Sequence, residues 1–304
     1  MRYASVVHNG RLTAVSVTEH GYRDLSALLH DSSASGDPML DLLRVIAETE
    51  LSQEVIEAQP LIPSDEVTVA PLLSRPGKIV AAPVNYEDHQ EEMKQLGNVS
   101  ALGFFLKSPT SVAAHGSTVR LPYSDRRFDQ EGELALVIGK RGRNIPQESV
   151  AEHIAGYTCL LDLTMRGGED RSTRKSFDTF TPVGPHLVTP DEVGDLDQLT
   201  MTCAVNGTVR QDTDIKDLIW GVPQFVSYVS SVTTLEVGDI ITTGTPAGVG
   251  VIRDGDTIEV SIDRIGTLAV TVSDEHAVPC PTLGANSGPH APETITPVRE
   301  RARS

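Results

Sequence analysis

Cysteine, basic residues and long apolar runs are all scarce in this chain of 304 residues. The three cysteines, Cys159, Cys203 and Cys280, are odd in number and widely spaced, and none belongs to a CxxC pair. This pattern argues against a disulfide framework and against a structural zinc site. Cys159 lies in an apolar run, which predicts a small buried hydrophobic side chain.

Positive charge is limited, because 25 Lys and Arg stand against 42 Asp and Glu, for a net charge of −17. Nucleic acids and anionic membranes are bound by clustered Lys and Arg, so neither is an expected partner. No apolar stretch reaches the roughly 18 residues of a membrane-spanning helix, and residues 1–10 lack the basic-then-apolar order of a signal peptide. We therefore expect a cytoplasmic protein.

The composition, 39% hydrophobic and 22% charged, is typical of a packed globular protein. Short alternating apolar runs between Gly, Pro, Asp and Asn predict a β-dominated mixed fold. The predicted strands are 3–7, 12–17, 78–81, 134–138, 156–161, 200–205, 239–242, 257–262 and 267–272. Near-helical spacing of apolar residues predicts helices over 39–51, 88–96, 147–154 and 214–231.

Changes of composition divide the chain into three segments. Residues 1–72 predict a small N-terminal α+β domain, and residues 73–275 the main, catalytic domain. Residues 276–304 are rich in Pro, Gly, Ala, Thr and Arg and carry no hydrophobic pattern. We expect a disordered tail there, and expect its deletion from residue 278 onward to leave activity unchanged.

Two glutamates stand just before an apolar strand, Glu131 and Glu133, separated by Gly132. Side chains two apart on a strand project to the same face, so these carboxylates would lie side by side. Solvated acids at an exposed strand end are the plainer interpretation. The alternative is a bound cation that relieves the repulsion of two like charges.

Asp162 closes the apolar run 156–161, where it could simply form a turn or cap a helix. The strand that ends before Asp162 could lie beside the strand that follows Glu131 and Glu133. In that case the three acids bring hard oxygen ligands together. Such a set suits Mg²⁺, Mn²⁺ or Ca²⁺. Zinc is disfavoured because no His or Cys accompanies the acids.

His89 and Glu92 are three apart at an expected helix start, so they share one helical face. The carboxylate could orient the imidazole as a general base, although a surface polar pair is the plainer interpretation. Lys175, flanked by aromatic and Pro/Gly residues, could be partly desolvated and hold a carboxylate or enolate; an exposed lysine is the default.

Thr245 lies in a Gly-rich turn, residues 244–250, that follows a predicted strand. The turn is neither a P-loop nor a dinucleotide fingerprint, so no nucleotide cofactor is indicated. Its backbone N–H groups and the Thr245 hydroxyl could contact a carboxylate. A purely structural turn fits equally well.

Taken together, these segments resemble the fumarylacetoacetate hydrolase family over about residues 78–272. Each motif is weak alone, and their order along the chain is what makes the resemblance specific. The motifs are Asn85-Tyr86 with His89 and Glu92, Phe105-Leu106-Lys107-Ser108-Pro109, Glu131-Gly132-Glu133-Leu134, Gly156-Tyr157-Thr158 with Asp162 and Arg166, Lys175-Ser176-Phe177-Asp178-Thr179-Phe180 with Gly184-Pro185, Asn206-Gly207 with Arg210-Gln211, and 244–250.

The resemblance implies a rolled, barrel-like mixed β-sheet with peripheral helices, usually in a homodimer. It implies a metal site for Mg²⁺ or Mn²⁺ made by three acids: Glu131, Glu133 and Asp162. It also implies a catalytic dyad on a lid segment, His89 and Glu92, with Lys175 beside the enolate. The residues implied to contact substrate are Arg166, Lys175 and Thr245.

The function implied is a metal-dependent hydrolase that cleaves a C–C bond of an acylpyruvate-type 2-oxo acid through a metal-stabilised enolate. One alternative is an isomerase or decarboxylase of unsaturated 2-hydroxy or 2-oxo dioates, or of oxaloacetate, in aromatic catabolism. A second alternative is an inactive, metal-stabilised dimeric scaffold.

Overall fold

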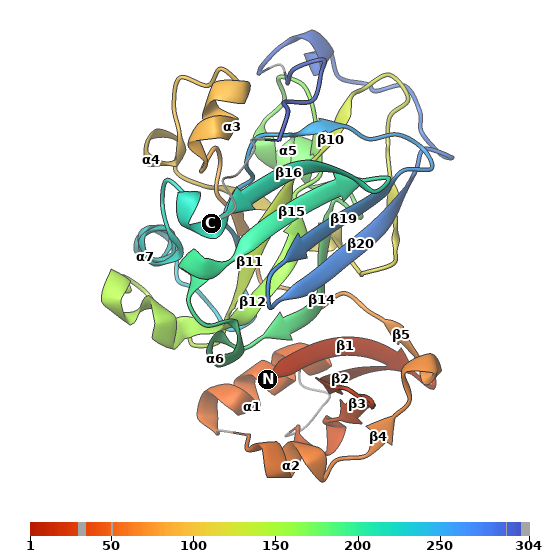
Figure 1. The fold of residues 1–304 in the computed structure, drawn as a ribbon, viewed down its shortest axis with the longest axis vertical. Coiled ribbons are helices and arrows are strands. Elements are labelled where there is room, and N and C mark those ends of the chain that lie inside the picture. The colour runs from red at the N-terminus through yellow and green to blue at the C-terminus, as the bar shows by residue number, and fades with distance from the viewer. Residues whose placement is uncertain (30–34, 50, 290, 299–304) are drawn as a thin grey trace.

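Most strands that the apolar alternation predicts are present in the computed structural model, which describes residues 1–29, 35–49, 51–289 and 291–298. They assemble into three sheets (Figure 1). The largest runs in the order β4 (Leu61–Ile62), β3 (Gly21–Asp24), β2 (Arg11–Thr18), β1 (Arg2–His8), β14 (Thr181–Val188), β12 (Ile154–Leu161), β11 (Gly132–Ile138), β17 (Ile240–Thr242), β6 (Ile79–Ala81) and β7 (Phe105–Lys107), with β5 (Val67–Val69) on β1 and β8 (Val112–Ala113) on β14.

Two smaller sheets complete the β structure. One runs in the order β16 (Thr208–Asp214), β15 (Thr200–Val205), β19 (Thr257–Ile262), β20 (Gly266–Ser273) and β9 (Thr118–Arg120). The other comprises β13 (Thr164–Met165), β10 (Phe128–Gln130) and β18 (Gly250–Val251). The predicted β-dominated mixed fold is confirmed, although the pairings among the described strands leave the sheets open and close no barrel.

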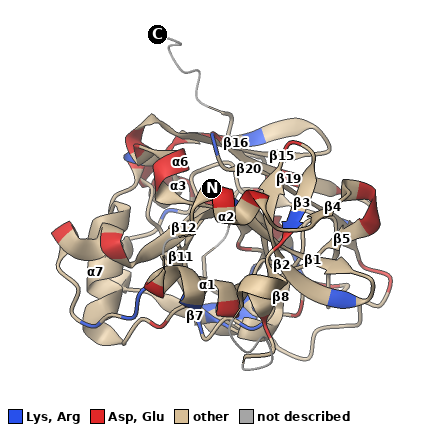
Figure 2. Cartoon of the chain, turned by 90° about the horizontal axis from the view of Figure 1, so that it is seen from below, with Lys and Arg blue, Asp and Glu red and all other residues tan. Residues whose placement is uncertain are grey.

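The helices are short and peripheral: α1 (Pro38–Glu48), α2 (Gln53–Glu57), α3 (Glu87–Glu92), α4 (Val99–Leu102), α5 (Arg171–Lys175), α6 (Pro190–Val193) and α7 (Val222–Val232). Figure 2 shows acidic residues spread around the outside of the fold, with basic residues scattered among them. Within the described residues, no helix has the length and apolar character needed to cross a bilayer.

Three predicted helices differ from the structure. Residues 147–153 form a 3₁₀ helix rather than an α-helix. The predicted helix 214–231 divides into a 3₁₀ turn and α7, because Pro223 fits only the first turn of a helix. The helix at 88–96 ends at Glu92, since Lys94 has a left-handed backbone with φ +49°.

β11 is buried along its whole length because it lies between two cores. Leu134 and Leu136 point into the core beneath the five-stranded sheet, which also contains Cys159, buried as predicted. Ala135 and Val137 point into the opposite core, which α1 covers. Burial on both faces explains why this strand is a continuous apolar run rather than an alternating one.

The N-terminal strands continue the largest sheet. β1 pairs antiparallel with β14, with Arg2 opposite Val188 and Tyr3 opposite Leu187. One continuous sheet therefore connects residues 1–72 to the rest of the chain.

Asp37 caps α1 through its side chain, which accepts from the backbone N–H groups of Met39 and Leu40.

Within the segment predicted to be a disordered tail, the structure describes residues 276–289 and 291–298 in contact with the rest of the fold; residues 290 and 299–304 lie outside the described residues. Arg127 Nη1 donates to the carbonyl oxygens of Ala291 at 3.2 Å and Pro292 at 2.9 Å. Ala291 is buried against Met93 and Val249. Backbone carbonyls make much of this contact, and they leave no periodic signal in the sequence.

Deleting residues 278–304 should lower the thermal unfolding midpoint by at least about 3 °C, because it removes the Arg127 contacts and uncovers Met93 and Val249. Calorimetry of the shortened and full-length chains measures this shift. Leu283→Ala is the matched control, since that side chain is fully exposed in the same segment. An unchanged midpoint after truncation would support the prediction of a disordered tail.

Candidate active site

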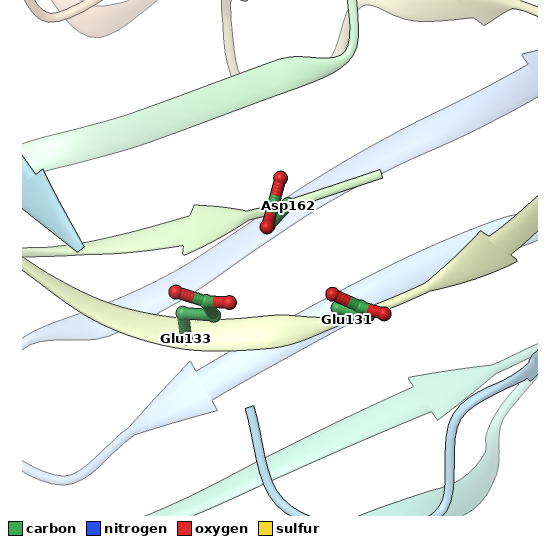
Figure 3. Close-up of side chains that lie close together, drawn as sticks. All are labelled: Glu131, Glu133 and Asp162. Atoms are coloured by element: carbon green, nitrogen blue, oxygen red, sulfur yellow. The ribbon is translucent and has the colours of Figure 1, made fainter. Parts of the chain in front are cut away.

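Glu131, Glu133 and Asp162 converge at one end of the β11–β12 pair (Figure 3). Gly132 pairs with Leu161, so the acids that flank these positions are neighbours, and Asp162 N donates to Glu131 O at 2.8 Å. One carboxylate oxygen of each acid lies within 4.8 Å of the others, and all three residues are buried. The exposed strand end is therefore the wrong interpretation.

Gly132 is required between the two glutamates. A Cβ built at this position would lie 2.9 Å from Cys203 Cβ on β15, which is too close for any side chain. The five-stranded sheet therefore packs directly against the start of β11. This contact holds Glu131 and Glu133 on a rigid strand rather than on a loop.

Lys175 and Arg166 both reach the cluster of acids. Lys175 Nζ lies 2.6 Å from Glu131 Oε2 and also contacts Asp162. Arg166 donates from Nη2 to Glu131 Oε1 at 2.8 Å and from Nε to Asp129 Oδ2 at 2.7 Å. Burial alone would raise the pKa of Glu131, but the positive charges of Lys175 and Arg166 outweigh it and hold that pKa well below its ordinary value.

Lys107 is a third cation at the site, to which the sequence analysis assigns no role. Its Nζ contacts Asp162 and donates to Phe180 O at 3.0 Å. Strand alternation in β7 places Lys107 on the same buried side as Phe105. The only signal in the sequence was the motif Phe105-Leu106-Lys107-Ser108-Pro109, because the burial of Lys107, which requires a partner for its charge, comes from the packing around β7.

Glu133 lacks an ion-pair partner among the described residues. Its Oε2 accepts from Gly244 N at 2.8 Å and from the Thr242 hydroxyl. Burial and the neighbouring Asp162 carboxylate raise the pKa of Glu133 to about 8. The protein's own cations therefore leave this acid uncompensated, and three oxygen donors without His or Cys fit a hard divalent cation.

His89 and Glu92 form a buried pair on α3, with His89 Nδ1 3.0 Å from Glu92 Oε2. Their side chains are only 7% and 0% exposed, so the surface-pair interpretation is wrong. An ionised carboxylate only accepts, so Nδ1 is the donor in this pair, and in a neutral imidazole Nε2 then carries the lone pair. His89 lines the same cavity as Glu131 and Glu133.

Glu92 is fixed from two further directions. Its Oε1 accepts from Gly248 N at 2.9 Å and from Thr296 Oγ1 at 2.6 Å. The C-terminal segment thus touches a predicted catalytic residue, and Pro289 lines the cavity beside His89. Truncation from residue 278 would remove the Thr296 contact, so the structure gives no support to the expectation of unchanged activity.

Thr245 lines the cavity, and its hydroxyl is engaged within the protein. It donates to Gly132 O at 2.9 Å and accepts from Gln211 Nε2 at 2.7 Å. These bonds fasten the Gly-rich turn to the start of β11. Gln211 in turn accepts from Gly132 N at 2.9 Å, a role that the sequence analysis does not assign.

Comparison with known proteins identifies the family of this chain. The family described as "Fumarylacetoacetate (FAA) hydrolase C-terminal" matches residues 78–273. Maleylpyruvate hydrolase of Aquipseudomonas alcaligenes is 42% identical over 250 residues, which are 78% of this chain and 85% of that protein. An oxaloacetate tautomerase of Bacillus subtilis is 36% identical over 250 residues, 78% of this chain and 83% of that protein.

A solved structure extends the similarity to nearly the whole fold. The crystal structure of maleylpyruvate hydrolase from Sphingobium sp. SYK-6, in complex with manganese(II) and pyruvate, matches with a TM-score of 0.78 at 34% identity, over 90% of this chain and 99% of that one. The resemblance predicted from the ordered motifs is confirmed. The chain belongs to the fumarylacetoacetate hydrolase family.

Proposed function

We propose that this protein is a divalent-metal-dependent hydrolase that cleaves a C–C bond of an acylpyruvate-type 2-oxo acid. One observation carries the proposal: the His89–Glu92 pair lines the same cavity as the buried acids Glu131 and Glu133, beside Asp162. Similarity to two maleylpyruvate hydrolases, one of them described with manganese(II) and pyruvate, supports this reaction.

The cofactor we propose is Mg²⁺ or Mn²⁺, held by Glu131, Glu133 and Asp162. When bound, it would act as a Lewis acid toward the 2-oxo acid. Lys175 and Arg166 place two further positive charges against Glu131, where negative charge develops in the substrate.

His89 would act as the general base. Its Nε2 takes a proton from water, and Glu92 stabilises the resulting imidazolium through Nδ1–H. The water oxygen bonds to the distal carbonyl carbon of the acylpyruvate, and the bond between that carbon and the neighbouring CH₂ then breaks. The electron pair stays with the three-carbon fragment, which takes up a proton to become pyruvate, while the acyl group leaves as a carboxylate.

Isomerisation is the second candidate function. The relatives include an oxaloacetate tautomerase and, in a solved structure at 28% identity with a TM-score of 0.74, a 5-carboxymethyl-2-hydroxymuconate delta-isomerase from Mycobacterium smegmatis. The same His89 base would then move a proton between two substrate atoms without consuming water. Decarboxylation of a related dioate is a third outcome that the same cavity could support.

We also propose that the protein acts on its small-molecule substrate as a homodimer, in the cytoplasm and within aromatic catabolism. The family resemblance supports the dimer and the pathway. The scarcity of cysteine and the absence of any CxxC pair support a reducing compartment.

A panel of acylpyruvates, oxaloacetate and unsaturated 2-oxo dioates, each assayed with Mn²⁺ and with Mg²⁺, tests the reaction. We expect acylpyruvates to yield pyruvate and a carboxylic acid, with one oxygen from H₂¹⁸O in the acid, detected by mass spectrometry. Loss of carbon dioxide, or a product of unchanged mass, would assign a decarboxylase or an isomerase instead.

Asp162→Asn and Glu131→Gln should each weaken Mn²⁺ binding and reduce turnover by at least about 100-fold, because each removes a charged ligand. Isothermal titration with Mn²⁺ and steady-state kinetics measure the two effects. Glu236→Gln, an exposed acid paired with Arg141, is the matched control and should change neither. Full turnover in the presence of a chelator would exclude a metal role.

His89→Ala should lower kcat for hydrolysis by about 10²- to 10⁴-fold, the range expected for loss of a general base. Mn²⁺ affinity should stay near that of the unmodified protein, because His89 is not among the three metal-ligand candidates. Near-normal turnover by this variant would show that another group activates water.

A further inference from the structure

The chain continues past the end of the family match, which stops at residue 273. Residues 280–289 and 291–298, which we call the C-terminal strap, therefore lie outside the segment that the family matches. Figure 1 shows this part of the chain in dark blue, above α5 and β10. Pro289 of the strap lines the cavity, yet the mechanism above assigns the strap no role.

The first part of the strap is attached to the loop between β13 and α5. Gly168 N donates to Gly284 O at 2.9 Å, and the Thr282 hydroxyl contacts Glu169. Arg126 Nη1 joins the two segments, because it donates to Glu169 Oε1 at 2.8 Å and to Thr282 Oγ1 at 3.0 Å. The strap is therefore fixed to the segment that leads into α5, whose cations line the cavity.

The second part of the strap is attached to α3, which carries the candidate base. Ala291 is buried against Met93, the residue that ends α3, and against Val249 of the Gly-rich turn. Thr296 Oγ1 donates to Glu92 Oε1 at 2.6 Å. The strap thus contacts both the wall of the cavity formed by α3 and the wall formed by α5.

The Thr296 contact bears directly on the orientation of the His89–Glu92 pair. The Glu92 side chain is 0% exposed, and its Oε2 lies 3.0 Å from His89 Nδ1, while its Oε1 accepts from Gly248 N and Thr296 Oγ1. The last torsion of a glutamate side chain is soft, so the donors at Oε1 determine where Oε2 points. Of the described residues, those that line the cavity do not include Thr296, so its hydroxyl can reach His89 only through Glu92.

We propose that Thr296 is a positioning residue for the His89–Glu92 pair, and that the C-terminal strap holds this pair in place relative to the cations of α5. This inference rests on the proposed function, since it takes His89 to be the general base. It gives a segment outside the family match a part in the reaction. An imidazole held by an oriented carboxylate keeps its lone pair directed at one point, which proton transfer requires.

Substitutions of Thr296 in the full-length, Mn²⁺-loaded protein test the proposal. Thr296→Val should lower kcat about 10-fold, the effect expected for one hydrogen bond to a charged group, and leave KM within about twofold. Thr296→Ser keeps the hydroxyl and should keep most of the activity. Thr294→Val, at an exposed threonine of the same strap, is the matched control and should change neither constant. An unchanged kcat in Thr296→Val, or an equal loss in Thr296→Ser, would overturn the proposal.

A double-mutant cycle tests whether Thr296 acts through Glu92. In the Glu92→Ala background, Thr296→Val should lower kcat no further, because the group that the hydroxyl orients is already missing. A second loss of about 10-fold in that background would show that the hydroxyl acts elsewhere, and would refute the positioning role.

Hydrogen exchange separates failure of this inference from failure of the proposed function, because it requires no turnover. Backbone amides of α3 should exchange at least about 5-fold faster in Thr296→Val than in the unmodified protein, and at the normal rate in Thr294→Val. Faster exchange without hydrolysis of any acylpyruvate would reject the proposed reaction and keep the role of Thr296 in holding the pair. Unchanged exchange with hydrolysis at the normal kcat would reject the inference and keep the reaction.

Discussion

Burial of three carboxylates within 4.8 Å of one another is the constraint around which this site is built. Like charges at this distance repel strongly where water is excluded. Lys107, Lys175 and Arg166 surround the cluster and lower that repulsion, but the pKa of Glu133 is still raised to about 8. The protein alone therefore leaves the cluster short of positive charge, which is the condition under which a divalent cation is held.

The scaffold keeps this unfavourable arrangement in place by anchoring it on a strand that is buried along its whole length. β11 is buried on both faces, and Gly132 lets β15 close directly over its start. The opposite side of the cavity is built differently, because His89 and Glu92 lie on a single short helix. Contacts from Gly248 and Thr296 fix Glu92 there, so the C-terminal segment takes part in positioning the candidate base.

Local patterns in the sequence predicted β11 and the paired glutamates, because strand alternation places Glu131 and Glu133 on one face. That Asp162 joins them depends on β12 lying beside β11, and no local pattern specifies which strands pair. The sequence assigned no role to Lys107 or Arg174 because a basic residue in a short element is usually exposed, and only the surrounding packing buries these two. The order of weak motifs along the chain identified the family, which hydrophobic periodicity alone does not do.

The partners of the basic residues distinguish those that stabilise the protein from one that is available to a ligand. Lys107 and Lys175 each neutralise an acid of the cluster, so replacing either would leave a buried carboxylate unpaired. Arg174 pairs with no acid among the described residues, and its buried Nε makes no hydrogen bond there.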